Sequence, residues 1–180
     1  MIDAPPSSAE LVEAVLARVG AGALAVAQRA GVRVSVLAEG ERFGDRSPAL
    51  RRIAAGVDGW PIPPAGLFVV EERTIYLRSL SPMTIAHEFA HALDCALGGG
   101  VYLSGVDPRI RRAFAGASAF VTPYAASACD EYFAECVRAF VEVNDPHSLW
   151  PRATRERLWS VDPRMAAIVA SLFEFDLIEG

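Results

Sequence analysis

Residues 81–94 read SPMTIAHEFAHALD, and this stretch predicts the helix against which the rest of the fold packs. Ser81 suits the position before a helix, and Pro82 suits its first turn, where a missing amide proton costs nothing. Apolar residues recur at every fourth position and would form a buried stripe: Ile85, Phe89, Leu93 and Leu97. Three glycines, at positions 98 to 100, would end the helix. We therefore predict a helix over Pro82–Leu97.

The residues before this helix alternate between helical and strand-like patterns. Ala9–Ala30 is rich in alanine and leucine at helical spacing, interrupted near Gly20. Valines at positions 32, 34 and 36 alternate with polar residues, as in a half-buried strand. Leu67–Val70 and Thr74–Leu80 are apolar and rich in β-branched residues, so we predict that they pair as a hairpin. The residues between them include neither the glycine nor the asparagine of the commonest hairpin turns.

Later segments are mostly helical in pattern. Helices are expected over Pro108–Ala117, Ala128–Val143 and Pro163–Phe173, with a short one near Ala49–Ala55. Strands followed by helices favour an α+β fold, in which helices pack on one side of a small mixed sheet. A chain of 180 residues is in the usual range for one domain, so we expect residues 1–180 to form one. Helix and strands would occupy about 9–80, and the helical part about 81–180.

Charge and composition argue against several classes of protein. The net charge of −5 is unlike that of nucleic-acid-binding proteins, which usually carry a basic face. The N-terminus lacks the basic start and apolar core of a secretory signal. The longest uncharged run, Ala113–Cys129, is too short and too polar to cross a membrane. An odd number of cysteines suits a reducing compartment. We expect a cytoplasmic protein, with export by a signal-independent route as the open alternative.

Two histidines and a glutamate lie close together on the predicted helix. Residues four apart share a helix face, so the imidazoles of His87 and His91 can converge on one ion, and zinc accepts such nitrogens. Glu88 lies beside the first histidine, where its carboxylate can reach a water on the metal without being a ligand. The alternative is a helix with two unrelated histidines. The helix start, the helix end and the apolar stripe all favour the zinc interpretation.

A catalytic zinc also needs a third protein ligand and one open coordination position. A histidine six residues beyond the second one would complete one known pattern, but position 97 is leucine. The remaining histidine, His147, follows a predicted helix end and is expected at the surface. The third ligand must therefore come from another type of residue.

Glu131 and Glu135 stand four apart on one face of the next predicted helix, which Ser127 and Asp130 would begin as a capping box. We favour Glu131 as the third ligand. Glu135 could accept a hydrogen bond from the distal ring nitrogen of a ligand histidine and so fix its orientation. The alternative is that both glutamates form a solvated helix face.

Together these residues resemble a known family of peptidases. The pattern His87-Glu-Phe-Ala-His91-Ala-Leu-Asp, followed by Tyr124-x6-Glu131-Tyr-Phe-Ala-Glu135, is similar to the catalytic domain of anthrax toxin lethal factor and to the Pro-Pro endopeptidases. The resemblance is strongest over residues 79–143. It implies a zincin-like fold of the gluzincin type, with His87, His91 and Glu131 holding one catalytic zinc ion. It also implies that Glu88 is the general base, that Glu135 supports a ligand histidine, and that the Tyr124 hydroxyl supports the oxyanion.

The resemblance also implies how a substrate would bind. Members of this family bind an extended peptide at a sheet edge, which Thr74–Leu80 or its hairpin partner would supply here. We therefore expect a zinc-dependent endopeptidase that acts on peptides or proteins, without nucleic-acid or membrane partners. Its oligomeric state stays open. One alternative is a catalytically silent, zinc-stabilised binding or regulatory module whose site Cys95 and Cys129 help to close. Another is a metal-free helical interaction domain.

Overall fold

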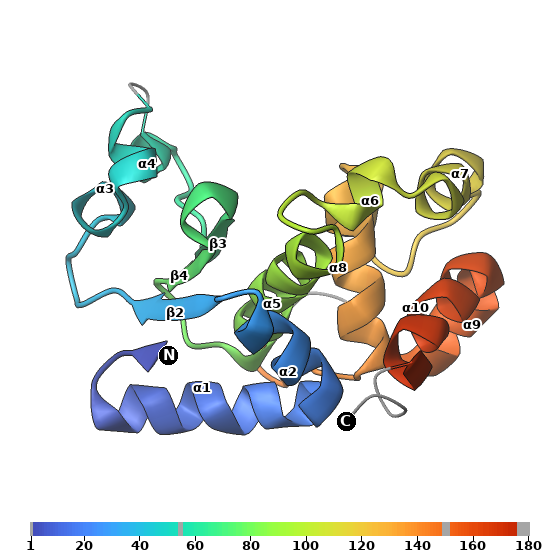
Figure 1. The fold of residues 1–180 in the computed structure, drawn as a ribbon, viewed down its shortest axis with the longest axis horizontal. Helices are drawn as coiled ribbons and strands as arrows, with labels where there is room; N and C mark the ends of the chain where they lie inside the picture. The colour runs from blue at the N-terminus through green and yellow to red at the C-terminus, as the bar shows by residue number, and fades with distance from the viewer. Residues whose placement is uncertain (1, 54–55, 149–151, 176–180) are drawn as a thin grey trace.

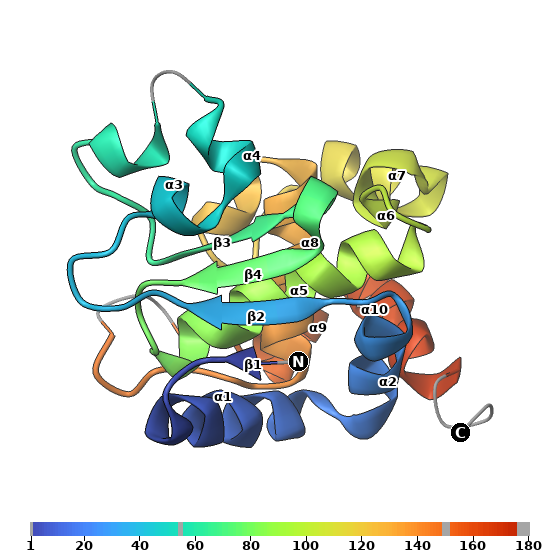
Figure 2. The same cartoon turned by 60° about the vertical axis from the view of Figure 1, so that its left-hand side comes forward.

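A mixed β-sheet forms the front of the molecule (Figure 2). The computed structural model describes residues 2–53, 56–148 and 152–175, and within them four strands pair in the order β1-β2-β4-β3. They span β1 (Ile2–Asp3), β2 (Arg33–Val36), β3 (Gly66–Val69) and β4 (Thr74–Leu77). β1 and β4 run parallel to β2 on either side of it, whereas β3 runs antiparallel to β4.

The predicted hairpin of β3 and β4 is confirmed, and an unusual turn closes it. A short 3-10 helix, η2 (Val70–Glu72), follows β3, and Arg73 then adopts a left-handed conformation with φ of 48°. The Arg73 guanidinium donates a hydrogen bond to the carbonyl oxygen of Ala30, 2.9 Å away. A tertiary contact thus holds the left-handed residue in the place where glycine or asparagine is usual.

Of the two strands expected to supply the sheet edge, Thr74–Leu80 does not lie at an edge and its hairpin partner does. β4 lies between β2 and β3, so both of its sides are paired, and its hairpin partner β3 is one of the two edge strands, with β1 at the other edge. The alternating valines near position 34 predict a strand, but they do not say which strand it pairs with. Parallel pairing with β2 is what moves β4 into the interior of the sheet.

The longer helices lie where the periodicity predicts them. They are α1 (Pro6–Val19), α2 (Ala21–Arg29), α5 (Pro82–Leu97), α7 (Pro108–Gly116), α8 (Cys129–Phe140) and α10 (Pro163–Phe175). Shorter turns join them: α3 (Phe43–Arg46), α4 (Pro48–Arg51), η1 (Val57–Gly59), α6 (Leu103–Val106), η3 (Tyr124–Ala126) and α9 (Arg155–Val161). Of the short helix expected near 49–55, α4 supplies the first part, and residues 54–55 lie outside the described residues.

Helix α5 is the centre of the fold. It packs against β3 and β4 on one side and against α8 on the other, while α1 and α2 flank it (Figures 1 and 2). α10 packs against α8 on the side away from the sheet. A smaller apolar cluster, which includes Phe43 and Tyr76, covers part of the opposite face of the sheet beneath α3 and α4. The expected α+β fold class, with an edge strand packed against the central helix, is confirmed.

The ends of α5 are fixed by local sequence. Pro82 occupies its first turn, although the hydroxyl of Ser81 makes no capping hydrogen bond. At the other end, a β-carbon on Gly98 would lie 2.0 Å from the carbonyl oxygen of Val101, so only glycine allows the chain to fold back there. Of the helices that the structure describes, none combines the length and the apolar character that a membrane span requires.

Candidate metal centre

Helices α5 and α8 cross so that two imidazoles and one carboxylate meet. His87 and His91 are one turn apart on the buried face of α5, and Glu131 projects from the first turn of α8. The Nε2 atom of His87 lies 3.0 Å from Oε2 of Glu131 and 3.1 Å from Nε2 of His91. The Nε2 atom of His91 is 3.3 Å from the same carboxylate oxygen. The three residues predicted as ligands are therefore brought together.

These donor atoms fit a zinc ion. Tetrahedral zinc with ligand distances of about 2.0–2.2 Å keeps its ligands roughly 3.3–3.6 Å apart, a few tenths of an ångström more than most of the separations seen here. Among the described residues, His87, His91 and Glu131 form a group whose ligand atoms could hold a metal ion. Two nitrogens and one carboxylate oxygen leave a fourth position for another molecule, as in catalytic zinc sites.

Neither cysteine of the closed-site alternative joins this group. The thiol of Cys129 donates to the carbonyl oxygen of Ser104 at 3.3 Å, and Cys95 is buried and free. The described cluster of possible ligands thus contains no sulfur. This arrangement favours an open site over a closed one.

The start of α8 differs from the expectation. The helix begins at Cys129, and the residue before it, Ala128, has no side chain that could cap it. The hydroxyl of Ser127 instead donates to the carbonyl oxygen of Tyr124 at 2.7 Å, within η3. The predicted capping box is therefore wrong, because Ser127 belongs to the preceding turn. Glu131 is still in the first turn of α8.

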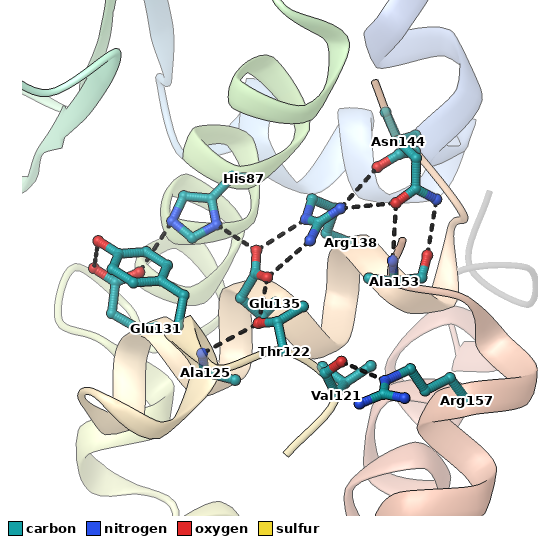
Figure 3. A network of polar contacts seen from close by, with 12 residues as sticks. His87, Val121, Thr122, Ala125, Glu131, Glu135, Arg138, Asn144, Ala153 and Arg157 are labelled. Carbon is teal, nitrogen blue, oxygen red and sulfur yellow. Dashed lines mark hydrogen bonds and ion pairs between the residues drawn. The ribbon is translucent and has the colours of Figure 1, made fainter. Parts of the chain in front are cut away.

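Glu135 holds the ring of His87 from the side opposite to Glu131. Its Oε1 atom lies 3.0 Å from Nδ1 of His87, the ring nitrogen that faces away from Glu131 (Figure 3). The same carboxylate accepts hydrogen bonds from Thr122 and Arg138. Although burial opposes it, the guanidinium of Arg138 and the imidazole of His87 hold the pKa of Glu135 well below its usual range. An ionised carboxylate thus faces the ring, as the sequence predicts.

Glu88 is buried beside the cluster without belonging to it. Burial raises the pKa of Glu88, against the lowering effect of the two histidines. Strand β3 passes so close that a β-carbon on Gly66 would lie 2.7 Å from Cγ of Glu88. The missing side chain of Gly66 is therefore what lets the edge strand approach the proposed base. A carboxylate with a raised pKa is suited to accept a proton near neutral pH.

Tyr124 reaches the site from η3. Its hydroxyl donates a hydrogen bond to Oε1 of Glu131 at 2.9 Å, and its ring centroid lies 5.6 Å from that of His87. Burial and the charge of Glu131 raise the pKa of Tyr124 above its usual range, so the hydroxyl keeps its proton at neutral pH. The side chain is half-exposed and thus accessible to another molecule.

The second histidine is supported differently from the first. The ring of Tyr102 packs beside His91 at 5.8 Å between centroids, and Nδ1 of His91 is buried without a hydrogen-bond partner among the described residues. Asp94, one turn further along α5, points elsewhere and accepts hydrogen bonds from the amide and the hydroxyl of Ser104. It therefore fastens α6 to α5. His147 is exposed, as expected.

A cleft of about 490 Å³ opens beside these residues. His87, Glu88 and Tyr124 line its floor, and its wall is the proline-rich segment before β3. Within that segment Trp60 and Ile62 are more than half exposed, and both line the cleft. The cleft gives a molecule of peptide size access to the candidate metal site.

Several residues of the site have no motif in the sequence. Thr122 and Arg138 support Glu135, Gly66 makes room for Glu88, and Tyr102 packs on His91. One signal was available for Arg138, which interrupts the apolar pattern of α8 three residues after Glu135. The others depend on contacts between segments that are far apart in the sequence.

Comparison with known proteins shows a likeness of fold. No family model and no curated protein matches the sequence. The structure is similar to that of the Pro-Pro endopeptidase PPEP-2 from Paenibacillus alvei, with a TM-score of 0.64 and 19% sequence identity. The match covers 96% of this chain and 96% of that chain, so the likeness extends over nearly the whole fold. The predicted resemblance to Pro-Pro endopeptidases is thus supported at the level of architecture.

Proposed function

We propose that this protein is a zinc-dependent endopeptidase of the gluzincin type, in which His87, His91 and Glu131 hold the metal. The observation that carries the proposal is the meeting of three ligand atoms within 3.3 Å of one another. A buried carboxylate and a cleft adjoin them. The fold shared with an endopeptidase supports the same conclusion.

Zinc bound by these residues would supply Lewis acidity, which lowers the pKa of water and polarises a peptide carbonyl. Glu88 accepts the proton of the attacking water at its carboxylate, and later donates it to the leaving amine. Tyr124 turns its hydroxyl from Glu131 toward the carbonyl oxygen and stabilises the developing negative charge. Glu135 keeps the His87 ring aligned throughout. Each residue thus has a distinct part in hydrolysis.

The substrate in this proposal is an extended peptide. β3 is an edge strand, packs against α5 and immediately follows the wall of the cleft, so a peptide laid along it would pass beside Glu88. Strand addition supplies backbone hydrogen bonds that do not depend on the peptide's sequence, and the cleft selects its side chains. The resemblance to lethal factor and the Pro-Pro endopeptidases favours this mode of binding.

A peptide-library digest of zinc-loaded protein tests the proposal. The parent should cleave a subset of peptides, whereas Glu88→Gln should retain zinc but lose turnover by about 10²-fold or more. His87→Ala should lose both zinc and turnover. Cleavage that survives in Glu88→Gln would show that the base is misassigned.

A zinc-bound chain that cleaves nothing and resists hydroxamates would instead favour the silent binding module, because a hydroxamate needs an open metal position. The absence of sulfur from the described ligand cluster argues against that alternative.

A further inference from the structure

We infer that Arg138 is a positioning residue of the metal centre, which acts on the ligand His87 through the carboxylate of Glu135. The inference rests on the proposed metal site and deepens it. It assigns zinc affinity and turnover in part to an arginine that is not itself a ligand.

The first step is the geometry around Glu135. Arg138 follows it by three residues on α8 and grips both of its oxygens, with Nε 2.9 Å from Oε1 and Nη2 2.8 Å from Oε2. Oε1 also faces Nδ1 of His87, and Oε2 also accepts the hydroxyl proton of Thr122 at 2.6 Å. Each oxygen therefore has two partners. A carboxylate held in this way presents one orientation to the imidazole (Figure 3).

The second step is what holds the arginine. Its Nη1 atom donates to Oδ1 of Asn144 at 3.0 Å and to the carbonyl oxygen of Val143 at 3.3 Å. The Asn144 amide pairs with both backbone groups of Ala153, at 2.8 and 2.9 Å. Figure 3 shows this chain of contacts running from His87 to Ala153. The guanidinium is thus held from the C-terminal side as well.

The third step is that stability does not explain the pair. Arg138 and Glu135 are 1% and 4% exposed, and a buried ion pair loses about as much hydration as it gains in attraction. Apolar side chains of similar size would fill the same space as well. A ligand histidine, however, needs an acceptor on its second nitrogen to hold the ring in place. The role of this ion pair is therefore to hold the imidazole of His87 in one orientation.

The fourth step is the contrast with the other histidine. Nδ1 of His91 has no hydrogen-bond partner among the described residues. Of the two histidines, His87 is therefore the one whose Nδ1 atom faces a carboxylate. Disturbing Arg138 should move one ligand and leave the other in place, which weakens the metal site without abolishing it.

The experiment is a double-mutant cycle read by zinc affinity. Zinc is titrated against a chelator into the metal-free parent, Arg138→Met, Glu135→Gln and the double variant, with thermal unfolding of each metal-free protein alongside. Loss of a supporting residue of this kind typically lowers metal affinity by about 10- to 100-fold, and we expect Arg138→Met to fall in that range. In the Glu135→Gln background the same substitution should change zinc affinity by less than about threefold. The carboxylate through which Arg138 acts on His87 is already missing from that background.

Arg157→Met is the matched control. Arg157 donates to the carbonyl oxygen of Val121, next to Thr122, but does not reach Glu135 (Figure 3). Its zinc affinity should stay within about threefold of the parent. Should Arg138→Met fail to fold, Arg138→Lys takes its place, with an expected loss of about 3- to 10-fold because lysine keeps the charge and lacks the two-pronged grip.

The outcomes separate this inference from the proposed function. A folded Arg138→Met that binds zinc like the parent, or an effect that is additive with Glu135→Gln, would overturn the inference while leaving peptidase activity in place. A parent that binds zinc but cleaves no peptide would overturn the proposed function alone, since the affinity cycle still reports on Arg138. A parent that binds no zinc overturns both.

Discussion

The substitution Gly66→Ala tests how closely the edge strand and the proposed base are matched. The added β-carbon would lie 2.7 Å from Cγ of Glu88, 3.1 Å from Cγ2 of Thr84 and 3.2 Å from Cδ2 of Leu77. Ordinary contact begins near 3.4 Å, so Glu88 or β3 must move by about 0.7 Å. Overpacking of this kind destabilises a protein by about 1–3 kcal/mol.

The expected effect on catalysis is about as large as the effect on folding, and it is measured separately. A displacement of about 1 Å in a catalytic group can reduce the rate by about 10²-fold, so we expect kcat/KM to fall by roughly 30- to 100-fold. This corresponds to about 2–3 kcal/mol of lost transition-state stabilisation. Zinc content should stay at the parent level, because the new methyl group meets Glu88 and not the ligands.

The assay is cleavage of a peptide selected from the library, with zinc content and denaturant unfolding measured on the same preparations. Gly105→Ala serves as the control, since a β-carbon there meets nothing within 4 Å. If Gly66→Ala kept more than about a third of the parent's kcat/KM, the close approach of β3 would have no bearing on the base. Loss of zinc together with activity would place the damage on the ligands and refute the argument in its present form.

Three further predictions concern other parts of the site. Tyr124→Phe should lower kcat by about 10²- to 10³-fold with only a small change in the unfolding midpoint, because the hydrogen bond to Glu131 that it removes belongs to a half-exposed side chain. Although burial opposes it, two facing carboxylates raise the pKa of His87 to about 10 in the metal-free protein. Protonation of His87 therefore stabilises the metal-free fold fully below about pH 6.5, and this stabilisation is lost as pH rises toward 10. Zinc must displace that proton, so calorimetry at neutral pH should detect proton release, and affinity should increase from pH 6 to 9. Asp94→Ala should destabilise the fold by about 2–4 kcal/mol in urea unfolding, because the buried amide and hydroxyl of Ser104 lose their acceptor; an unchanged midpoint would contradict that reading.

The parts of the structure that follow from local sequence were predictable. Helix α5 has the predicted bounds, since Pro82 and the glycines after Leu97 set its ends. Spacing along one helix also places His87 and His91 on one face without any knowledge of the fold. The meeting with Glu131 needed more than spacing, because two helices must cross at the correct angle. The place of Glu131 at the start of the next predicted helix favours it as the third ligand, and the family pattern supports the same assignment.

The errors arose where distant segments decide the outcome. The family resemblance leaves either strand of the hairpin as the sheet edge, and pairing with β2 places β4 inside the sheet. Ser127 reads as a helix cap, yet its hydroxyl serves the turn before the helix. Gly66 reads as an ordinary loop glycine until β3 is seen against Glu88. In each case the residue has a common local role, and a contact from elsewhere in the chain overrides it.

Helix α8 shows how packing and chemistry are joined in this fold. The polar side chains of this helix are more deeply buried toward its C-terminal end. The side chains of Glu131, Glu135 and Arg138 are 19%, 6% and 1% exposed, in that order. One helix therefore supplies the proposed ligand at the cleft, the carboxylate that orients another ligand, and the arginine that holds this carboxylate in the core. The buried residues Phe133 and Val137 pack α8 into the core and so set its angle against α5. Since interiors are close-packed, a change in that angle would move all three polar groups together. The position of the candidate metal site thus depends on apolar contacts that lie outside any catalytic motif.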